Sequence, residues 1–245
     1  PIADRWGGWL VTGHFEVAHR VNNTADRDSD GKWVVAARPA RDLHAFAKDF
    51  QAERYLRATS DIGALLALEQ QATVHNLLVR ATHQMLYLLD KDRVLNELLG
   101  ETPDNDGNMR ASTQRIADAL AKEITATLLL DGEAPLTKHR AASSAEFARD
   151  FAAMWPRDSD GVQLGELDVS KRTFVLPMSP MIHSQAFHRL PKELRIRVFA
   201  RLQVAIERGV PPGNVKLDRP TRAILARHLR NTMPDWPQPR VRRHQ

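Results

Sequence analysis

The feature that most constrains the fold of this chain is the stretch of residues 60–89, which contains a single Gly and no Pro. It opens on Ser60 and Asp61, whose side-chain oxygens can accept the unpaired backbone N–H groups of a first helical turn. We therefore predict one long helix at the centre of the fold. At about 100° per residue, its apolar residues fall on one broad arc that we expect to be buried: Ala64, Leu68, Ala72, Val74, Leu78, Val79, Met85, Leu86 and Leu89.

Polar residues on the same stretch form a first candidate site. His75 falls inside the apolar arc, where a histidine is either a core residue with satisfied hydrogen bonds or a ligand. Along the opposite side, Glu69, Asn76, Arg80 and His83 recur at helical spacing. Four hydrogen-bonding groups could therefore face one common partner.

The rest of the chain predicts a mainly α fold, an irregular helical bundle around this central helix. Two stretches are expected to be non-helical: a Trp- and Gly-rich loop at the N-terminus, and a long passage near residues 156–190 that is broken by Pro177 and Pro180. Periodicity and stop signals predict further helices over residues 42–56, 110–130, 145–155, 191–209 and 219–233.

Length and composition indicate a folded domain. The chain has 245 residues, of which 42% are hydrophobic, and this is enough for a sizeable core. It contains neither an internal repeat nor a Gly/Ser-rich linker, so we expect a single helical domain over residues 1–235. A basic, Pro-containing tail follows at residues 236–245.

The net charge of +5 bears on the partners of the chain. A basic protein can bind an acidic protein surface, an anionic membrane surface or a nucleic acid. The recognition signatures of nucleic-acid-binding proteins are missing, so we do not expect a nucleic acid partner. No stretch approaches the ~18 uninterrupted apolar residues of a membrane span, so we expect no transmembrane segment.

An acidic turn offers a candidate calcium site. Asp26, Asp28 and Asp30 alternate ahead of Gly31, which matches the first six positions of a calcium-binding loop. The twelfth position, however, is Ala37 instead of the bidentate Glu. Similar turns recur at residues 104–107 and 158–161. An acidic β-turn on the surface is therefore the competing interpretation.

The motifs of several enzyme classes are missing from the sequence. The serine-hydrolase elbow, the phosphate loop and the dinucleotide-binding loop are absent, and Glu69 is followed by Ala72 where a di-iron Glu-x-x-His motif needs His. The chain has no cysteine, which excludes disulfides, thiolate zinc sites, a Cys nucleophile and haem attachment through C-x-x-C-H. Histidine and methionine remain, and both can be axial ligands of a haem.

Short blocks of sequence keep their order along the chain: RWGGW at residues 5–9, His19, RYL at 54–56, SDI at 60–62, His75 with Asn76, GEAPL at 132–136 and PRD at 156–158. Together they resemble the downstream region of a family of secreted bacterial c-type cytochrome proteins. The resemblance spans nearly the whole chain. In that family a C-x-x-C-H haem segment lies upstream of the Trp block, and a Cys lies near the position of Met178; neither is present here.

The resemblance implies an electron-transfer role in the periplasm or outside the cell. The chain would be a domain or subunit that packs near a haem carried by another segment or chain, with a c-type cytochrome segment or another redox protein as its partner. On this interpretation the cofactor-facing residues and their supports are Trp6, Trp9, His19, Glu69, His75 and Arg80.

Two alternatives stay open, and with them the question of whether the protein is an enzyme. The first is a non-catalytic structural or assembly subunit of a larger complex, whose basic surface docks an acidic partner. The second is a haem peroxidase- or oxidase-like enzyme. In that enzyme His19 or His75 would act as acid and base, and Arg80 would stabilise developing negative charge.

Overall fold

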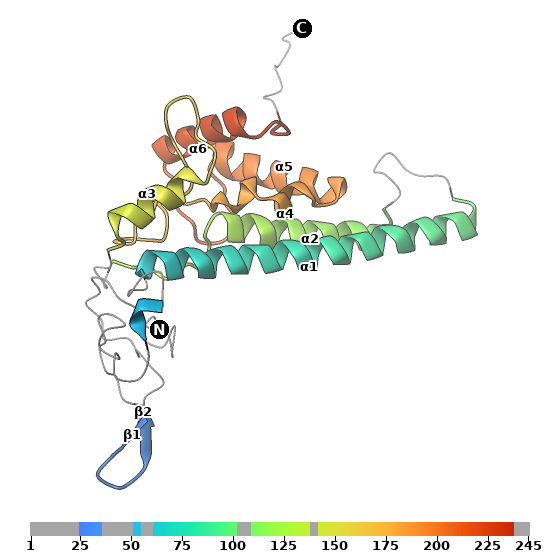
Figure 1. Cartoon of the computed structure of the whole chain (residues 1–245). Coiled ribbons are helices and arrows are strands. Elements are labelled where there is room, and N and C mark those ends of the chain that lie inside the picture. The colour runs from blue at the N-terminus through green and yellow to red at the C-terminus, as the bar shows by residue number, and fades with distance from the viewer. Residues whose placement is uncertain (1–24, 36–50, 55–60, 102–108, 138–141, 238–245) are drawn as a thin grey trace. The chain divides into compact units, whose positions relative to one another are not determined.

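The computed structural model describes residues 25–35, 51–54, 61–101, 109–137 and 142–237 (Figure 1). The fold is mainly α, as the sequence predicts. The two short strands pair as an antiparallel hairpin in which Arg27 lies opposite Trp33. In chain order the elements are β1 (Ala25–Arg27), β2 (Trp33–Val35), η3 (Ala52–Arg54), α1 (Ile62–Leu99), α2 (Ala111–Leu128), α3 (Ala145–Ala153), η4 (Pro180–His183), α4 (Gln185–His188), α5 (Lys192–Arg208) and α6 (Arg219–Thr232).

Several predictions fall on residues outside these ranges. The Trp- and Gly-rich N-terminal loop, with Trp6, Trp9 and His19, is one of them. Most of the helix predicted at residues 42–56 also lies outside, and only η3 is described there. These predictions stay predictions.

The long helix is confirmed as α1, which has 38 residues and continues beyond Leu89 to Leu99. Asp61 begins it as expected, because its Oδ1 accepts a hydrogen bond of 2.7 Å from the backbone N–H of Gly63. The helix ends at Gly100, which has a φ of 63°, a left-handed conformation that Gly adopts without strain.

The chain forms two compact units, and α1 contributes to both. The first unit comprises residues 1–69, 133–152 and 166–175. Its described core is a small apolar cluster of Ile62, Leu65, Leu66, Leu136 and Val169. The single domain expected over residues 1–235 stays a prediction.

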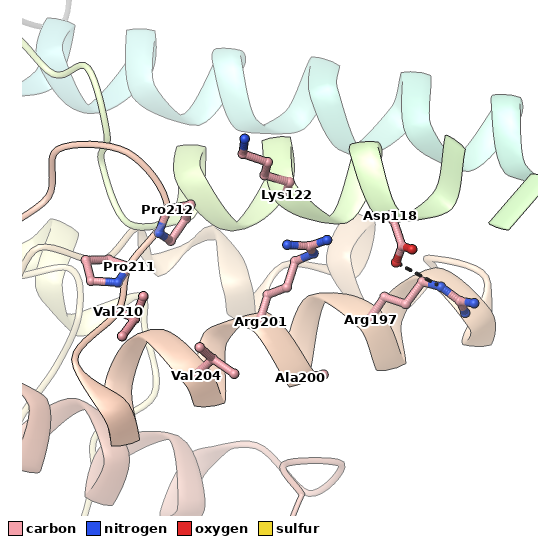
Figure 2. A pocket seen from close by; sticks show the side chains of 9 residues that line it. All are labelled: Asp118, Lys122, Arg197, Ala200, Arg201, Val204, Val210, Pro211 and Pro212. Atoms are coloured by element: carbon pink, nitrogen blue, oxygen red, sulfur yellow. Dashed lines mark ion pairs between the residues drawn. The ribbon is translucent and has the colours of Figure 1, made fainter. Parts of the chain in front are cut away.

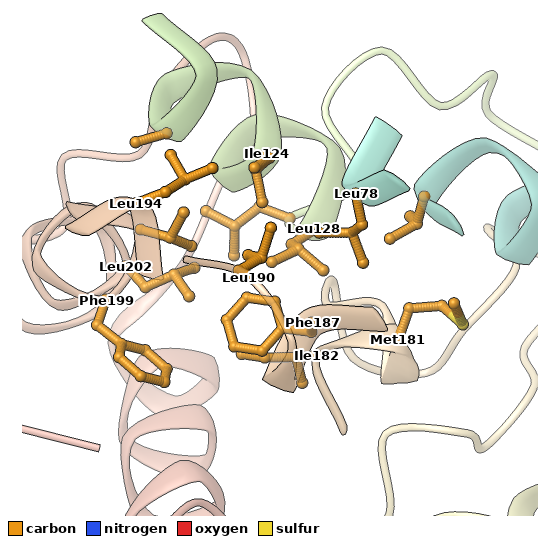
Figure 3. Close-up of a cluster of buried hydrophobic side chains, with 14 of the residues drawn as sticks. Leu78, Ile124, Leu128, Met181, Ile182, Phe187, Leu190, Leu194, Phe199 and Leu202 are labelled. Atoms are coloured by element: carbon orange, nitrogen blue, oxygen red, sulfur yellow. The ribbon is translucent and has the colours of Figure 1, made fainter. Parts of the chain in front are cut away.

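The second unit comprises residues 70–132, 153–165 and 176–245 and contains the larger core. In this unit α2 lies alongside α1 (Figure 1), and Arg80 of α1 forms an ion pair with Glu123 of α2. Helix α5 packs on both α2 and α6. Figure 3 shows side chains from α1, α2, α4 and α5 meeting in one cluster, among them Leu78, Ile124, Leu128, Phe187, Leu194 and Leu202.

The expected non-helical passage is correct only in its first part. Residues 154–179 have no helix, but η4 and α4 follow where the sequence prediction had none. Ser179 and Ser184 cap these short helices, because each Oγ accepts a hydrogen bond of 3.2 Å from a backbone N–H in the first turn. Pro180 therefore starts a helix instead of breaking one, since Pro is tolerated in a first turn.

Candidate functional site

The broad apolar arc predicted on α1 is divided in two by the structure. Val74, Leu78 and Met85 are fully buried in the larger core. Val79 and Leu86 lie on the exposed half, where their side chains are 38% and 53% exposed. A helix that packs on neighbours along one side buries only the stripe that faces them. The prediction that the whole arc is buried is therefore wrong, and α1 carries a second apolar face that no described residue covers.

His75 lies on this uncovered half of α1 and is exposed. The expectation that His75 sits in a buried apolar arc is wrong for the same geometric reason. We call the surface formed by Ala72, His75, Val79 and Leu86, all of which are exposed, the exposed α1 face. Their spacing of three, four and seven residues keeps them on one side of the helix.

The polar residues predicted along α1, Glu69, Asn76, Arg80 and His83, all lie on this helix, and Arg80 already forms an ion pair. Arg80 Nη2 lies 2.5 Å from Glu123 Oε1, and both side chains are about half exposed. Glu69 is half-buried, and Asn76 and His83 are exposed. The prediction that these side chains lie opposite the apolar residues is wrong for Asn76 and His83, which are three and four residues from Val79 and therefore lie on the same exposed side. The other residues predicted to face a cofactor, Trp6, Trp9 and His19, lie outside the described ranges.

The proposed calcium residues belong to a hairpin turn. Asp28 Oδ1 accepts hydrogen bonds from the backbone N–H groups of Asp30, at 3.0 Å, and Lys32, at 2.8 Å. This is how an aspartate stabilises a turn. Asp26 lies in β1. Among the residues that the structure describes, no group of three His, Asp or Glu side chains is arranged to hold a metal ion.

The same turn recurs in the second unit, where it is part of a buried cluster. Asp158 Oδ1 accepts hydrogen bonds from the N–H groups of Asp160, at 3.0 Å, and Val162, at 2.8 Å. Gly161 has a φ of 85°, which the turn requires. Here the second carboxylate oxygen points at α6: Asp158 Oδ2 lies 3.4 Å from Arg227 Nε and 3.7 Å from His228 Nδ1.

His228 extends this cluster to η4. Its side chain is fully buried, and its Nε2 lies 3.2 Å from Nε2 of His183, which is partly buried at the end of η4. The two rings meet edge to face, at an interplanar angle of 73°. Asp158, His228 and His183 thus form a chain of polar groups that joins the acidic turn, α6 and η4.

Burial controls the charge state of this cluster. It lowers the pKa of His183 to about 3, and repulsion from His228 and His188 acts in the same direction. Burial also lowers the pKa of His228, although attraction to Asp158 opposes the shift. For Asp158 burial favours the neutral acid, but hydrogen bonds from Val162 and Asp160 and the charge of Arg227 outweigh it and lower the pKa. At neutral pH the cluster therefore pairs two neutral imidazoles with one carboxylate.

The carboxylate also selects the direction of the hydrogen bond between the imidazoles. If His228 carried its proton on Nε2, a bare lone pair on Nδ1 would face Asp158. With the proton on Nδ1, His228 presents an N–H to the carboxylate and its Nε2 accepts a hydrogen bond from His183. The second arrangement is electrostatically favourable. The two ring nitrogens that face each other then share one hydrogen bond. The cluster therefore connects the acidic turn, α6 and η4 through buried polar contacts.

The sequence analysis missed Asp158 and His228 as members of a cluster. Two features of the sequence nevertheless indicated these residues. His228 lies between Leu225 and Leu229 on the apolar stripe of α6, which predicts a buried imidazole. The repeated Arg-Asp-Ser-Asp-Gly turn marked Asp158. Only the tertiary structure brings the two together.

Comparisons with known proteins do not assign the chain to a family. Neither the models of known protein families, nor curated proteins, nor solved structures give a match to this chain. Among the described helices, none has the length and continuous apolar character that crossing a membrane requires.

Proposed function

We propose that the chain is a non-catalytic binding module for electron transfer in the periplasm or outside the cell. It packs against a c-type cytochrome segment or another redox protein that carries the haem. The observation that carries the proposal is the exposed α1 face: Ala72, His75, Val79 and Leu86 form a mainly apolar surface on a helix whose other side is already buried. The exposed His83, four residues from Val79 and three from Leu86, lies on the same side. A helix with a second exposed apolar stripe has a surface suited to a partner.

The short sequence blocks described above support the involvement of a haem. They resemble the downstream region of cytochrome proteins, and the chain lacks the cysteines for covalent haem attachment. This excludes covalent haem within these residues and leaves a non-covalently bound haem or a haem on the partner, and we place it on the partner. On this side of α1, His75 and His83 are the side chains that could approach it with a nitrogen ligand or a hydrogen bond.

The test is to purify the full chain together with its bound partner from its native source and to record the absorbance of this complex in the Soret region. We expect a Soret band in the complex and none in the chain alone. A charge at Val79 or Leu86 would have to be desolvated in the interface, so Val79→Glu with Leu86→Glu should remove most of the co-isolated haem.

Leu98→Glu is the matched control, because Leu98 is exposed on the same helix but away from this face. It should retain the band. If the double variant retains the band as fully as Leu98→Glu does, the exposed α1 face is not the binding surface.

The second candidate is an assembly subunit without haem, and the same exposed α1 face favours it. A native complex that forms through this face but shows no Soret band would support the assembly role and exclude the electron-transfer role. The peroxidase-like alternative gains nothing from the geometry. The guanidinium of Arg80 is already paired with Glu123, so it is not held ready for charge that develops on a substrate.

A further inference from the structure

A pocket separate from the exposed α1 face lies between α2 and α5, within the second unit (Figure 2). Its volume is about 460 Å³. Pockets of this size are large enough for small molecules, and they typically combine an apolar lining with a few polar groups that fix orientation. The lining here has that composition.

One end of the pocket is apolar. Val204 from α5 and the segment Val210, Pro211 and Pro212 form its wall. Figure 2 shows Val204 on the helix and the other three side chains in the segment that follows it. Val210 is 63% exposed, which is high for a valine. An apolar group placed at this end would remove that surface from water.

The wall is held in a fixed conformation. Gly209 ends α5 with a φ of 69°, and two prolines restrict the backbone that follows. Asp131 then fixes the next residues, because its Oδ1 accepts a hydrogen bond of 2.9 Å from the N–H of Asn214. The close packing of Gly213 on the Asp131 carboxylate leaves no room for a side chain at this position. The pocket therefore does not depend on a mobile loop.

The other end of the pocket is positively charged. Lys122 projects from α2, and the guanidinium of Arg201 reaches from α5 toward α2 (Figure 2). Asp118 also lines the pocket, but its carboxylate is paired with Arg197 at 3.4 Å. Within the described part of the chain, no carboxylate forms an ion pair with Lys122 or Arg201. Figure 2 shows the ammonium of Lys122 turned away from α5, so Arg201 is the cation that faces the space between α2 and α5. An anionic group placed in that space would form an ion pair with Arg201.

We propose that this pocket binds a small amphipathic carboxylate. Its apolar tail would lie against Val204, Val210 and the two prolines, and its carboxylate would bind the guanidinium of Arg201. No His or Met lines the pocket, so a haem iron would find no axial ligand there. The inference is independent of the proposed cytochrome partner.

The test uses the purified full chain and decanoate as the probe, with binding followed by isothermal titration calorimetry. We expect saturable binding of one decanoate per chain and much weaker binding of decanol, which keeps the tail but lacks the charge. Arg201→Gln should raise the Kd for decanoate at least tenfold, because it removes the charge-assisted hydrogen bond to the carboxylate.

Arg230→Gln is the matched control, because it removes one positive charge from an exposed position on α6. It should leave the Kd unchanged. Val210→Asp, in the exposed wall, should weaken decanoate binding without reducing the helical circular dichroism of the chain. Equal affinity for decanol and decanoate, an equal loss of affinity in Arg230→Gln, or no saturable binding up to millimolar concentration would each overturn the proposal.

Discussion

The cluster of Asp158, His228 and His183 predicts how the stability of the fold depends on pH. The folded chain keeps both imidazoles neutral because their pKa values are lowered, His183 to about 3. Between about pH 6.5 and 3 the unfolded chain takes up protons that the folded chain does not. His183 should therefore reduce the free energy of unfolding by about 1.4 kcal/mol per pH unit as the pH falls through this range, and His228, whose pKa is also lowered, should act in the same direction.

The lowered pKa of Asp158 acts in a lower pH window, because its contribution is present above the ordinary carboxyl value, about 3.9, and is lost below it. Urea unfolding between pH 7.5 and 4.5 isolates the histidine part. His183→Phe should make the pH dependence shallower, and His83→Ala, an exposed histidine on α1, should not. Identical slopes for the two variants would contradict the buried neutral pair.

A second residue-scale prediction concerns Gly165, which packs directly on the Trp155 ring. A Cβ at this position would lie 2.2 Å from Trp155 Cδ1, which is too close for any carbon contact. Gly165→Ala should lower the free energy of unfolding by about 1–3 kcal/mol through overpacking. The cost should shrink in a Trp155→Val background, where the ring is gone, and urea unfolding of the double-mutant cycle measures this coupling. An unchanged cost would show that the ring is not the cause.

At the scale of single elements, α1 combines a buried face with an exposed one at adjacent positions. Met85 is fully buried and Leu86 is 53% exposed. Met85→Ala should cost about 2–5 kcal/mol of unfolding free energy, because it leaves a cavity in the larger core. Leu86→Ala should stay within about 0.5 kcal/mol of the wild type, as other surface substitutions do. Urea unfolding of the isolated chain checks both values, and a comparable loss in the two variants would refute the assignment of faces.

On the scale of the whole molecule, the described parts of the two compact units differ in how much apolar surface they bury. The first has the small cluster around Ile62 and Leu136, while the second has the core built from α1, α2, α5 and α6. Opening a region costs more when more apolar contacts must break. Native-state hydrogen exchange should therefore show α3 opening at a lower free energy than α2 and α5. Equal protection in all three helices would mean that the chain unfolds only as one unit.

Much of the helical fold was predictable from local chemistry. The start of α1 at Asp61, the stripe of α2 and the Pro191-to-Gly209 boundaries of α5 each follow from caps, periodicity and stop signals. The end of α1 was predicted at Leu89, ten residues before the helix stops at Leu99. The short helices η4 and α4 were missed because Pro177 and Pro180 read as breaks. Ser179 and Ser184, which cap these two helices, were the sequence features that favoured helix at this place.

The candidate site was less predictable. Glu69, His75 and Arg80 lie on α1 as the helical spacing requires, but spacing does not determine which side of α1 is covered. That depends on α2 and its neighbours, which come from distant parts of the sequence. The same holds for the buried pair of His183 and His228, whose ring nitrogens meet only because η4 packs beside α6.

The amino-acid sequence by itself determined the class of the fold and the place of its long helix, because caps, glycines and apolar periodicity act within a few residues of one another. Only the tertiary structure decided that His75 faces solvent while His228 is buried. It also decided that Lys122 and Arg201 share one pocket. Burial and the grouping of charged residues around a pocket depend on segments that meet only in the tertiary structure. The periodicity of a single helix does not determine them.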